Sequence, residues 1–196
     1  MKQFKGQKDL EKDVELLNSQ VERCNEILKR LTLNPVEEDE FIDKDINIRD
    51  YLHEIISSFK EISKKEFVFN FDQDSNSKKI TKSIELVYGL RNFIGNANKF
   101  AKNTIFINLK SDSEITEITV EDDGDGYPRD IISKIGEPYL KSNYSKDKSK
   151  EGLGLGLFIG KTLLEKNFAS VNCRNSKTRN GAEVVIRWKN KELFNI

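Results

Sequence analysis

Apolar residues near the start of the chain recur at alternating spacings of four and three positions, at Leu10, Val14, Leu17, Val21, Cys24, Leu28 and Leu31. This is the heptad pattern of a coiled coil, in which two positions of every seven line one seam. No Gly or Pro interrupts residues 7–33, and Asn34-Pro35 ends the pattern. One helix cannot bury such a seam alone. We therefore expect residues 1–34 to be a dimerisation helix that pairs with a second chain or another helix through residues 10–31; docking on its own domain is the alternative.

Beyond this segment the pattern changes to shorter helical and strand periods. Residues 35–46 form an acidic connector that ends in a short strand, and one domain over residues 47–196 follows. Asn180-Gly181 predicts a turn before the last strand. Helices interleaved with mostly antiparallel strands predict an α+β fold, a two-layer α/β sandwich with helices on one face of the sheet. The expected helices are 48–59, 82–101, 131–135 and 154–166, and the expected strands are 66–71, 104–109, 115–120, 170–174 and 182–188.

Composition narrows the class of protein. The chain has 196 residues, 36% of them apolar and 34% charged, and its 33 Lys and Arg balance its 33 Asp and Glu. This balance argues against a nucleic-acid-binding surface, and no run approaches the ~18 apolar residues of a membrane span. The N-terminal residues lack a signal-peptide pattern, and two distant cysteines fit a reducing compartment. We expect a cytoplasmic location, with membrane attachment only through segments upstream of this sequence.

The most informative motif is Gly-Leu-Gly-Leu-Gly-Leu, directly before an apolar helical pattern. Alternate glycines uncover backbone N–H groups, and a helix start adds unpaired donors and the positive end of the helix dipole, which together favour phosphate. Two other phosphate loops are excluded. A Walker A loop that ends in Gly160-Lys161-Thr162 needs glycine at position 155, which is Leu155. A dinucleotide fingerprint needs glycine at position 159 or 157, depending on where it starts, and these are Ile159 and Leu157. The candidate phosphate-binding residues are Gly152, Leu153, Gly154, Leu155, Gly156 and Leu157.

A second motif, Asp122-Asp123-Gly124-Asp125-Gly126, follows the expected strand 115–120. A carboxylate can only accept hydrogen bonds, so Asp122 would select an exocyclic amine such as that of adenine. Gly124 and Gly126 would let a planar ring approach the backbone. An acidic turn and a calcium loop are the alternatives, but the glutamate that a calcium loop needs at its twelfth position is absent.

A third motif lies on the expected helix 82–101. Spacings of four and three place Asn92, Asn96 and Lys99 on one helix face. A neutral amide oxygen can bind Mg²⁺, which usually bridges to substrate phosphates, and Lys99 would add positive charge beside them. Two solvated asparagines on an exposed face are the alternative.

These motifs follow one another as Asn92…Asn96, Asp122-x-Gly124-x-Gly126, Glu137-Pro138-Tyr139, Gly152-x-Gly154-x-Gly156 and Asn180-Gly181-Ala182. The series resembles the N, G1, F, G2 and G3 boxes of the histidine-kinase catalytic domain, in the gyrase/Hsp90/kinase/MutL ATP-binding superfamily. The resemblance covers about residues 35–190. Residues 20–28, 136–139, 152–164 and 181–188 are similar to the redox-responsive RegB/PrrB group of sensor kinases.

The resemblance implies the Bergerat ATP-binding fold with ATP and Mg²⁺ as cofactors. In such a site Asp122 would bind the adenine amine, Asn96 would ligate Mg²⁺, and Asn92 and Lys99 would lie beside the phosphates. Residues 138–151 would be a mobile ATP lid, anchored by Tyr139 and with Lys141 near the phosphates. The backbone of residues 152–156 would wrap the triphosphate.

The resemblance also bears on the reaction. Hydrolytic relatives carry a glutamate four residues before the Mg²⁺ asparagine, as base for water, and here that position is Asn92. An amide cannot take a proton, so we expect phosphoryl transfer to a nucleophile instead. The one histidine, His53, is followed by Glu54 but not by Thr-Pro-Leu, and it lies inside the expected catalytic domain. We therefore expect no phosphoacceptor histidine in this chain.

The expected partners are then the histidine-bearing helix of the same kinase's dimerisation region and the receiver domain of a response regulator. Two other functions stay open: a non-catalytic ATP-sensing dimerisation module, and an anti-sigma-type Ser/Thr kinase of the same superfamily. Cys24 occupies a seam position, where two copies would approach in a parallel dimer. In the group of kinases that this chain resembles, the matching cysteine is associated with redox control through an intermolecular disulfide. The alternative is that Cys24 is a small apolar side chain that only packs in the seam.

Overall fold

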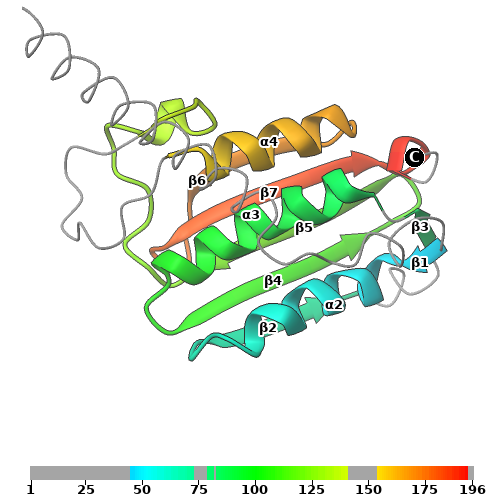
Figure 1. Cartoon of the computed structure of the whole chain (residues 1–196), viewed down its shortest axis with the longest axis horizontal. Helices are drawn as coiled ribbons and strands as arrows, with labels where there is room; N and C mark the ends of the chain where they lie inside the picture. The colour runs from blue at the N-terminus through cyan, green and yellow to red at the C-terminus, as the bar shows by residue number, and fades with distance from the viewer. Residues whose placement is uncertain (1–44, 73–78, 82, 141–153, 194–196) are drawn as a thin grey trace, which may run out of the picture. The chain divides into compact units, whose positions relative to one another are not determined.

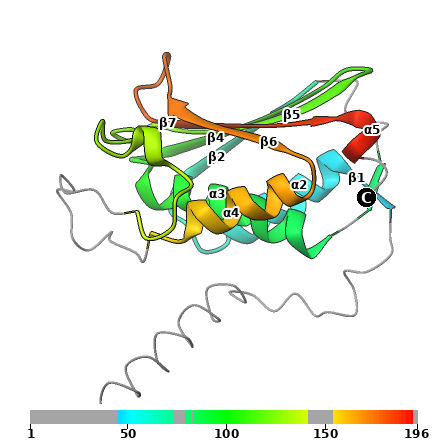
Figure 2. The same ribbon diagram turned by 90° about the horizontal axis from the view of Figure 1, so that it is seen from above.

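Helices cover one face of a five-stranded sheet, and the other face is open (Figures 1 and 2). The computed structural model describes residues 45–72, 79–81, 83–140 and 154–193, all within one unit of the chain, Phe41–Ile196. The expected dimerisation helix, Cys24, most of the acidic connector and residues 141–153 lie outside the described residues.

The sheet order is β2-β4-β5-β7-β6. Strand β2 pairs in parallel with β4, and every other neighbouring pair in this sheet is antiparallel. A small separate sheet pairs β1 with β3. The strands are β1 (Asp45–Asn47), β2 (Glu66–Phe71), β3 (Lys79–Thr81), β4 (Thr104–Ser111), β5 (Ile115–Asp122), β6 (Ser170–Asn175) and β7 (Ala182–Lys189).

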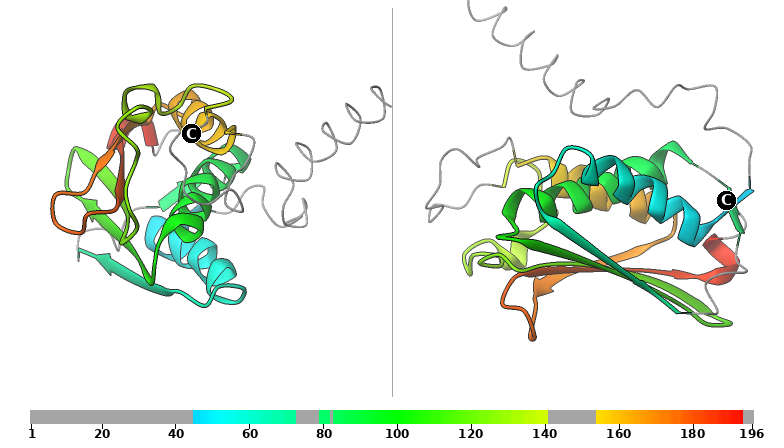
Figure 3. Two further views of the ribbon diagram at one scale, coloured as in Figure 1. Left: turned by 90° about the vertical axis from the view of Figure 1, so that its left-hand side faces the viewer. Right: turned by 90° about the horizontal axis from the view of Figure 1, so that it is seen from below.

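Helices α2 (Ile48–Lys60) and α3 (Ile84–Phe100) begin after polar residues whose side chains cap them. Asn47 Oδ1 accepts the Arg49 N–H at 2.9 Å, and Ser83 Oγ accepts the Leu86 N–H at 3.1 Å. Helix α3 lies between α2 and α4 on the covered face of the sheet (Figure 3). The helical segments are α2 (Ile48–Lys60), α3 (Ile84–Phe100), the 3₁₀ turn η3 (Ile132–Lys134), α4 (Gly156–Lys166) and α5 (Asn190–Leu193).

The core fills the space between the helices and the sheet. Strand β4 alternates as expected for a sheet with one covered face, with Ile105, Ile107 and Leu109 buried and the residues between them partly exposed. Helix α3 contributes Phe93 and Ile94, which are 1% and 0% exposed. Burial of these apolar side chains is the main term that stabilises the layer.

Helices α3 and α4 pack closely because two glycines lie at their crossing. A Cβ at Gly160 would lie 3.0 Å from the Asn92 Cβ, and a Cβ at Gly89 would lie 2.6 Å from the Leu164 side chain. Small residues at a crossing let two helix axes approach. This contact holds the first turn of α4 beside the middle of α3.

The structure confirms the two-layer sandwich with helices on one face and each main strand and helix expected of the described residues. It differs in details. The short strand β3 and helix α5 were not expected, and residues 132–134 form a 3₁₀ turn. The connection from β6 to β7 has six residues, 176–181, and Asn180, with φ 62°, stands near its end rather than in a two-residue turn.

Candidate functional site

Asp122 ends β5 with its side chain buried on the helical side of the sheet. It is 2% exposed, and its Oδ1 accepts hydrogen bonds from the N–H groups of Gly124 at 2.8 Å and Ala182 at 3.2 Å. Burial raises the pKa of the Asp122 carboxyl, and these two bonds work against the rise. One carboxylate oxygen is thus held by the protein, and Oδ2 is the candidate acceptor for a ligand.

Two glycines surround this carboxylate where no side chain would fit. A Cβ at Gly124 would lie 2.5 Å from the Phe100 carbonyl oxygen and 2.7 Å from Asp122 Oδ1. A Cβ at Gly181 would overlap the Asp122 carbonyl oxygen. Gly126, with φ 74°, lies against the Asn175 side chain. The backbone around Asp122 is therefore packed by three segments that are distant in sequence.

The next residue, Asp123, connects this loop to the end of α3. Its carboxylate accepts the N–H groups of Lys102 at 2.7 Å and Asn103 at 3.0 Å. Burial works to raise the pKa of Asp123, but the backbone hydrogen bonds outweigh it and the pKa is lowered. Asp123 therefore supports the loop, and Asp122 stays the candidate carboxylate for a ligand.

The asparagines and the lysine of the third motif are half-buried on α3. Asn92 donates from Nδ2 to the Tyr88 carbonyl at 2.8 Å, and its Oδ1 lies 3.4 Å from the position of a Cβ on Gly156. Among the described residues the Asn96 side-chain amide has no hydrogen-bond partner. Lys99 Nζ lies 5.5 Å from the centre of the Phe100 ring. The Asn92 amide thus donates a hydrogen bond within its own helix, whereas the Asn96 amide oxygen is a candidate to bind a ligand.

The first turn of α4 supplies backbone donors beside Asn92. Leu155 is its N-cap and makes no side-chain capping bond, so the first N–H groups of the helix have no side-chain partner there. Gly156 and Leu157 begin the helix, and Leu157 packs partly against the core. Gly154 has φ 69°, and a Cβ there would lie 2.7 Å from the Leu140 nitrogen, so glycine is required at this position.

Helix α3 therefore joins two ends of one candidate site. At Asn92 it meets the first turn of α4, and at Phe100 it meets Gly124 beside Asp122. Residues 92 and 100 are eight positions apart, or about 12 Å along a helix that rises about 1.5 Å per residue. This separation is comparable with the length of a nucleoside triphosphate from its base to its outer phosphates.

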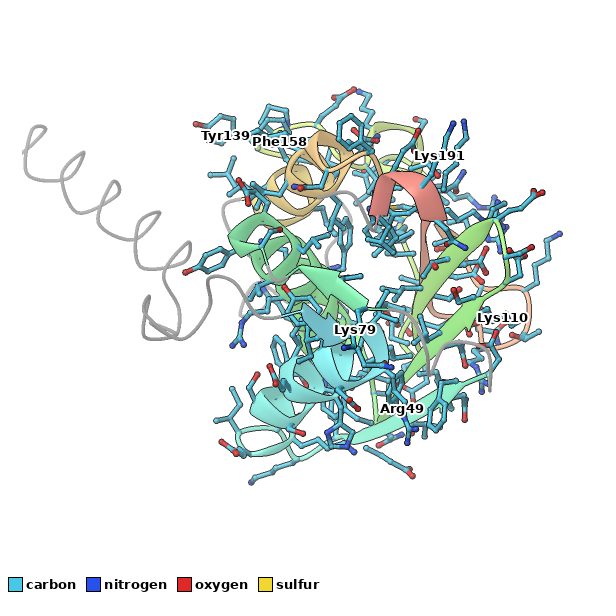
Figure 4. The ribbon with its side chains drawn as sticks, turned by 90° about the vertical axis from the view of Figure 1, so that its right-hand side faces the viewer. Arg49, Lys79, Lys110, Tyr139, Phe158 and Lys191 are labelled. Carbon is cyan, nitrogen blue, oxygen red and sulfur yellow. The ribbon has the colours of Figure 1, made fainter. Side chains whose placement is uncertain are left out.

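Other expected site residues are not brought into this arrangement by the described structure. Tyr139 has φ 60° and is 59% exposed, and its ring points outward in Figure 4. Lys141, Gly152 and Leu153 lie outside the described residues. Their expected roles near the phosphates stay predictions.

Two features of the site were missed in the sequence. Phe100 is 43% exposed although aromatic, and it ends α3 next to Gly124. Its position directly after Lys99 of the third motif could have indicated that Phe100 lies near the candidate site. Asn175 clamps the backbone of Tyr127, accepting its N–H at 2.6 Å and donating to its carbonyl at 3.0 Å. No local pattern announces this contact, which spans 48 residues of sequence.

A buried pair of titratable groups lies behind the same loop. The Tyr127 hydroxyl and the Cys173 thiol are hydrogen-bonded, and burial raises the pKa of both groups. For Cys173 the pKa reaches about 11. A thiol in this setting is protonated at neutral pH and acts as a packing residue.

The described residues contain neither a metal-binding cluster nor a membrane-spanning helix. No group of three or more His, Cys, Asp or Glu side chains in this part of the chain is arranged to hold a metal ion. No helix there is both long and apolar enough to span a bilayer.

Comparison with known proteins decides the family. The model of the family described as "Histidine kinase-, DNA gyrase B-, and HSP90-like ATPase" matches residues 81–192, which is more than half of the chain. The chain belongs to this ATPase family. The match contains Asn92, Asn96, Asp122 and the glycine-rich run, so the motifs found in the sequence lie within the family domain.

Curated relatives include sensor kinases. Sensor histidine kinase RegB of Cereibacter sphaeroides is 31% identical over 175 residues, which cover 85% of this chain and 37% of RegB. Sensor protein RstB of Escherichia coli is 31% identical over 99 residues, which cover 50% of this chain and 23% of RstB. The chain thus spans little more than a third of RegB and less of RstB.

Solved structures share the fold of this family member. The mycobacterial sensor histidine kinase MprB has a TM-score of 0.63 at 17% identity, covering 74% of this chain and 97% of that chain. The catalytic domain of histidine kinase ThkA has a TM-score of 0.61 at 19% identity, covering 75% and 97%. The fold of the described residues is the Bergerat ATP-binding fold of histidine-kinase catalytic domains.

Proposed function

We propose that this chain is the ATP-binding kinase core of a two-component sensor histidine kinase. In this function it moves the γ-phosphoryl group of ATP to a histidine outside the chain, from which a response-regulator aspartate receives it. The observation that carries the proposal is the buried Asp122, which has one oxygen held by Gly124 and Ala182. The family match and the sequence similarity to RegB and RstB support the same function.

At the base end, Asp122 Oδ2 accepts the exocyclic amine of adenine. Glycine is required at positions 124 and 181 because the Phe100 carbonyl and the Asp122 backbone lie against them, and these contacts fix the backbone around the carboxylate. The Phe100 carbonyl lies against Gly124, and the ring of the same residue is 43% exposed, so this ring is our candidate apolar face for the base. A charged hydrogen bond plus ring contact distinguishes adenine from bases without the amine.

At the phosphate end, neutral and cationic groups face the triphosphate. The amide oxygen of Asn96 fits Mg²⁺, because it is a hard neutral ligand with no protein partner among the described residues. When bound, Mg²⁺ would bridge the phosphate oxygens and offset their charge. Lys99 lies toward the base end of α3, with its Nζ 5.5 Å from the Phe100 ring, and we propose that its long side chain turns to the phosphates when the nucleotide binds. Asn92 with the N–H groups at the start of α4 orients the phosphates. Gly152, Leu153, Lys141 and Tyr139 belong to the same proposal.

The site favours transfer to a side chain over hydrolysis. Asn92 stands at the position where hydrolytic relatives carry a glutamate, and its amide donates to the Tyr88 carbonyl. An amide at this position cannot remove a proton from water. The protein's contribution is therefore positioning and charge, which suits a phosphoryl group passed to a histidine that another element presents.

His53 does not fit the acceptor role. It is exposed on α2, and its Nδ1 lies 3.3 Å from Ser57 Oγ on the same helix. Helix α3 separates α2 from α4 and its first turn (Figure 3). We therefore place the acceptor on a histidine-bearing helix that pairs with residues 1–34 in a cytosolic homodimer, with residues 35–46 as linker and 47–196 as catalytic domain. Cys24 on the seam would join two copies under oxidising conditions.

Phosphoryl transfer tests this proposal directly. The chain is incubated with Mg²⁺ and γ-labelled ATP, alone and with a helical hairpin that carries a His-Glu-Thr-Pro-Leu helix followed by residues 7–33. We expect label on the hairpin and none on the isolated chain, because His53 is not the acceptor. A hairpin with the histidine changed to alanine is the matched control.

Other outcomes separate the alternatives. ATP binding without transfer would point to a nucleotide-sensing module. Label on a serine or threonine would point to the anti-sigma type of kinase. Label on His53 itself, lost in His53→Ala, would overturn the placement of the acceptor outside the chain.

A further inference from the structure

The loop between β6 and β7 contacts both sides of the end of β5. Side chains alternate along a strand, so neighbours Glu121 and Asp122 point to opposite faces of the sheet. Asp122 continues the buried row of Ile118 and Val120, whereas Glu121 lies on the open face. Glu121 is nevertheless only 7% exposed, because the loop of residues 176–181 covers it.

On the open face the loop is bound through the Glu121 carboxylate. Ser176 Oγ donates to Oε1, Thr178 Oγ1 lies 3.3 Å from the same oxygen, and Arg179 Nε donates to Oε2 at 3.3 Å. Ser176 Oγ also accepts the N–H groups of Thr178 at 3.1 Å and Arg179 at 3.0 Å. The Arg179 guanidinium stacks on the Phe106 ring at 3.5 Å. One carboxylate therefore organises the whole turn.

On the helical side the same loop ends against Asp122. The Ser176 N–H donates to the Gly181 carbonyl at 2.8 Å, which closes the loop. Gly181 packs on the Asp122 backbone, and the Ala182 N–H donates to Asp122 Oδ1 at 3.2 Å. Release of the loop from Glu121 would therefore loosen one of the two N–H donors, the other being Gly124, that fix which carboxylate oxygen of Asp122 faces a ligand.

Other carboxylates on the open face do not share this arrangement. Glu117 pairs with Arg187, and Glu183 pairs with Arg174, so each joins two strands. Their side chains are 23% and 15% exposed, against 9% for Glu121. Among the described residues, Glu121 is the acidic side chain of this face that binds the loop.

We infer that Glu121 is a positioning residue for base selectivity, acting through the Ser176–Gly181 loop on the orientation of Asp122. The inference rests on the proposed function, in which Asp122 accepts the adenine amine. A well-oriented carboxylate distinguishes ATP from ITP, whose base carries a carbonyl in place of that amine. A loosened Asp122 would still lie near the base but would discriminate less.

The test measures dissociation constants for Mg-ATP and Mg-ITP by calorimetry on the full chain, with the melting temperature of each variant. We expect wild type to prefer ATP by about tenfold or more. Glu121→Ala and Ser176→Ala should lower that preference by about threefold to tenfold, with ITP affinity nearly unchanged. Glu121→Gln should restore most of it, because the amide oxygen still accepts from Ser176. Glu117→Ala, on the same strand and face, is the matched control.

The outcomes are separable. A purely structural role would lower the melting temperature and weaken ATP and ITP equally, which would overturn the inference while leaving the ATP site intact. Wild type that binds ATP no better than ITP would overturn the adenine contact at Asp122, and the inference with it. If Glu121→Ala does not fold, Ser176→Ala, which removes a single hydroxyl, decides.

Discussion

Asp122→Asn separates binding from folding at the centre of the candidate site. Asp122 Oδ1 accepts the N–H groups of Gly124 and Ala182, and an asparagine oxygen can accept both. The asparagine NH₂ must then occupy the position of Oδ2. There a donor would face the amine of adenine, which is also a donor, so the ligand loses its hydrogen bond while the protein keeps its own.

The size of the effect follows from this geometry. A hydrogen bond to a charged group contributes about 1.5–3 kcal/mol, so we expect ATP affinity to fall by about 10-fold to 150-fold. Folding should not suffer. Burial raises the pKa of Asp122, so the folded chain binds a proton there more tightly than the unfolded chain. Wild type therefore loses stability as the pH rises from the pKa of Asp122 in the unfolded chain to its higher pKa in the folded chain. The Asp122→Asn side chain does not ionise, so the variant does not lose this stability.

The assay combines Mg-ATP calorimetry with urea unfolding at neutral pH and at lower pH. Wild-type affinity should decline as pH falls through the raised pKa of Asp122, because the protonated carboxyl is a weaker acceptor, and Asp122→Asn should not show that decline beyond the titration of ATP itself. Asp125→Asn is the matched control, since Asp125 is on the same loop, is 84% exposed and pairs with Lys102. Wild-type ATP affinity in a folded Asp122→Asn protein would refute the assigned adenine contact.

Three further changes test neighbouring parts of the argument. Gly181→Ala should destabilise the protein by about 1–3 kcal/mol in urea unfolding, because its Cβ would overlap the Asp122 backbone; Gly156→Ala, whose Cβ has room, should unfold nearly like wild type. Phe100→Ala should weaken ATP binding by about 0.5–1.5 kcal/mol with little loss of stability, since its ring is 43% exposed; equal affinity would remove Phe100 from the site. Oxidation should give a covalent dimer on non-reducing electrophoresis that disappears in Cys24→Ala and persists in Cys173→Ala, because burial raises the Cys173 pKa to about 11; a dimer that survives Cys24→Ala would contradict the proposed disulfide.

Local sequence patterns predict several strands and the helix that carries the asparagine motif. Alternation along residues 104–109 and 115–120 predicted half-buried strands, and the structure has β4 and β5 there, each two residues longer at the end. The spacing of Asn92, Asn96 and Lys99 placed them on one helix, and all three lie on α3. These features depend on periodicity and on residue chemistry, which act over a few positions of the chain.

Other parts of the site depend on contacts between distant segments. The parallel pairing of β2 with β4 and the strand order have no local signal, since they depend on which packing of layers buries the most apolar surface. Likewise, Phe100 is an ordinary aromatic residue in the sequence and becomes a candidate base contact only where its helix end meets Gly124.

The sequence by itself determined which chemical groups are available: a carboxylate after a strand, amides on a helix face, and glycines before a helix. The tertiary structure decided how they act together. It brings Ala182 to Asp122 across 60 residues and binds the β6–β7 loop to Glu121 across 55. Hydrogen bonds of this kind need donor and acceptor within about 3 Å, and only the folded sheet brings such distant residues that close.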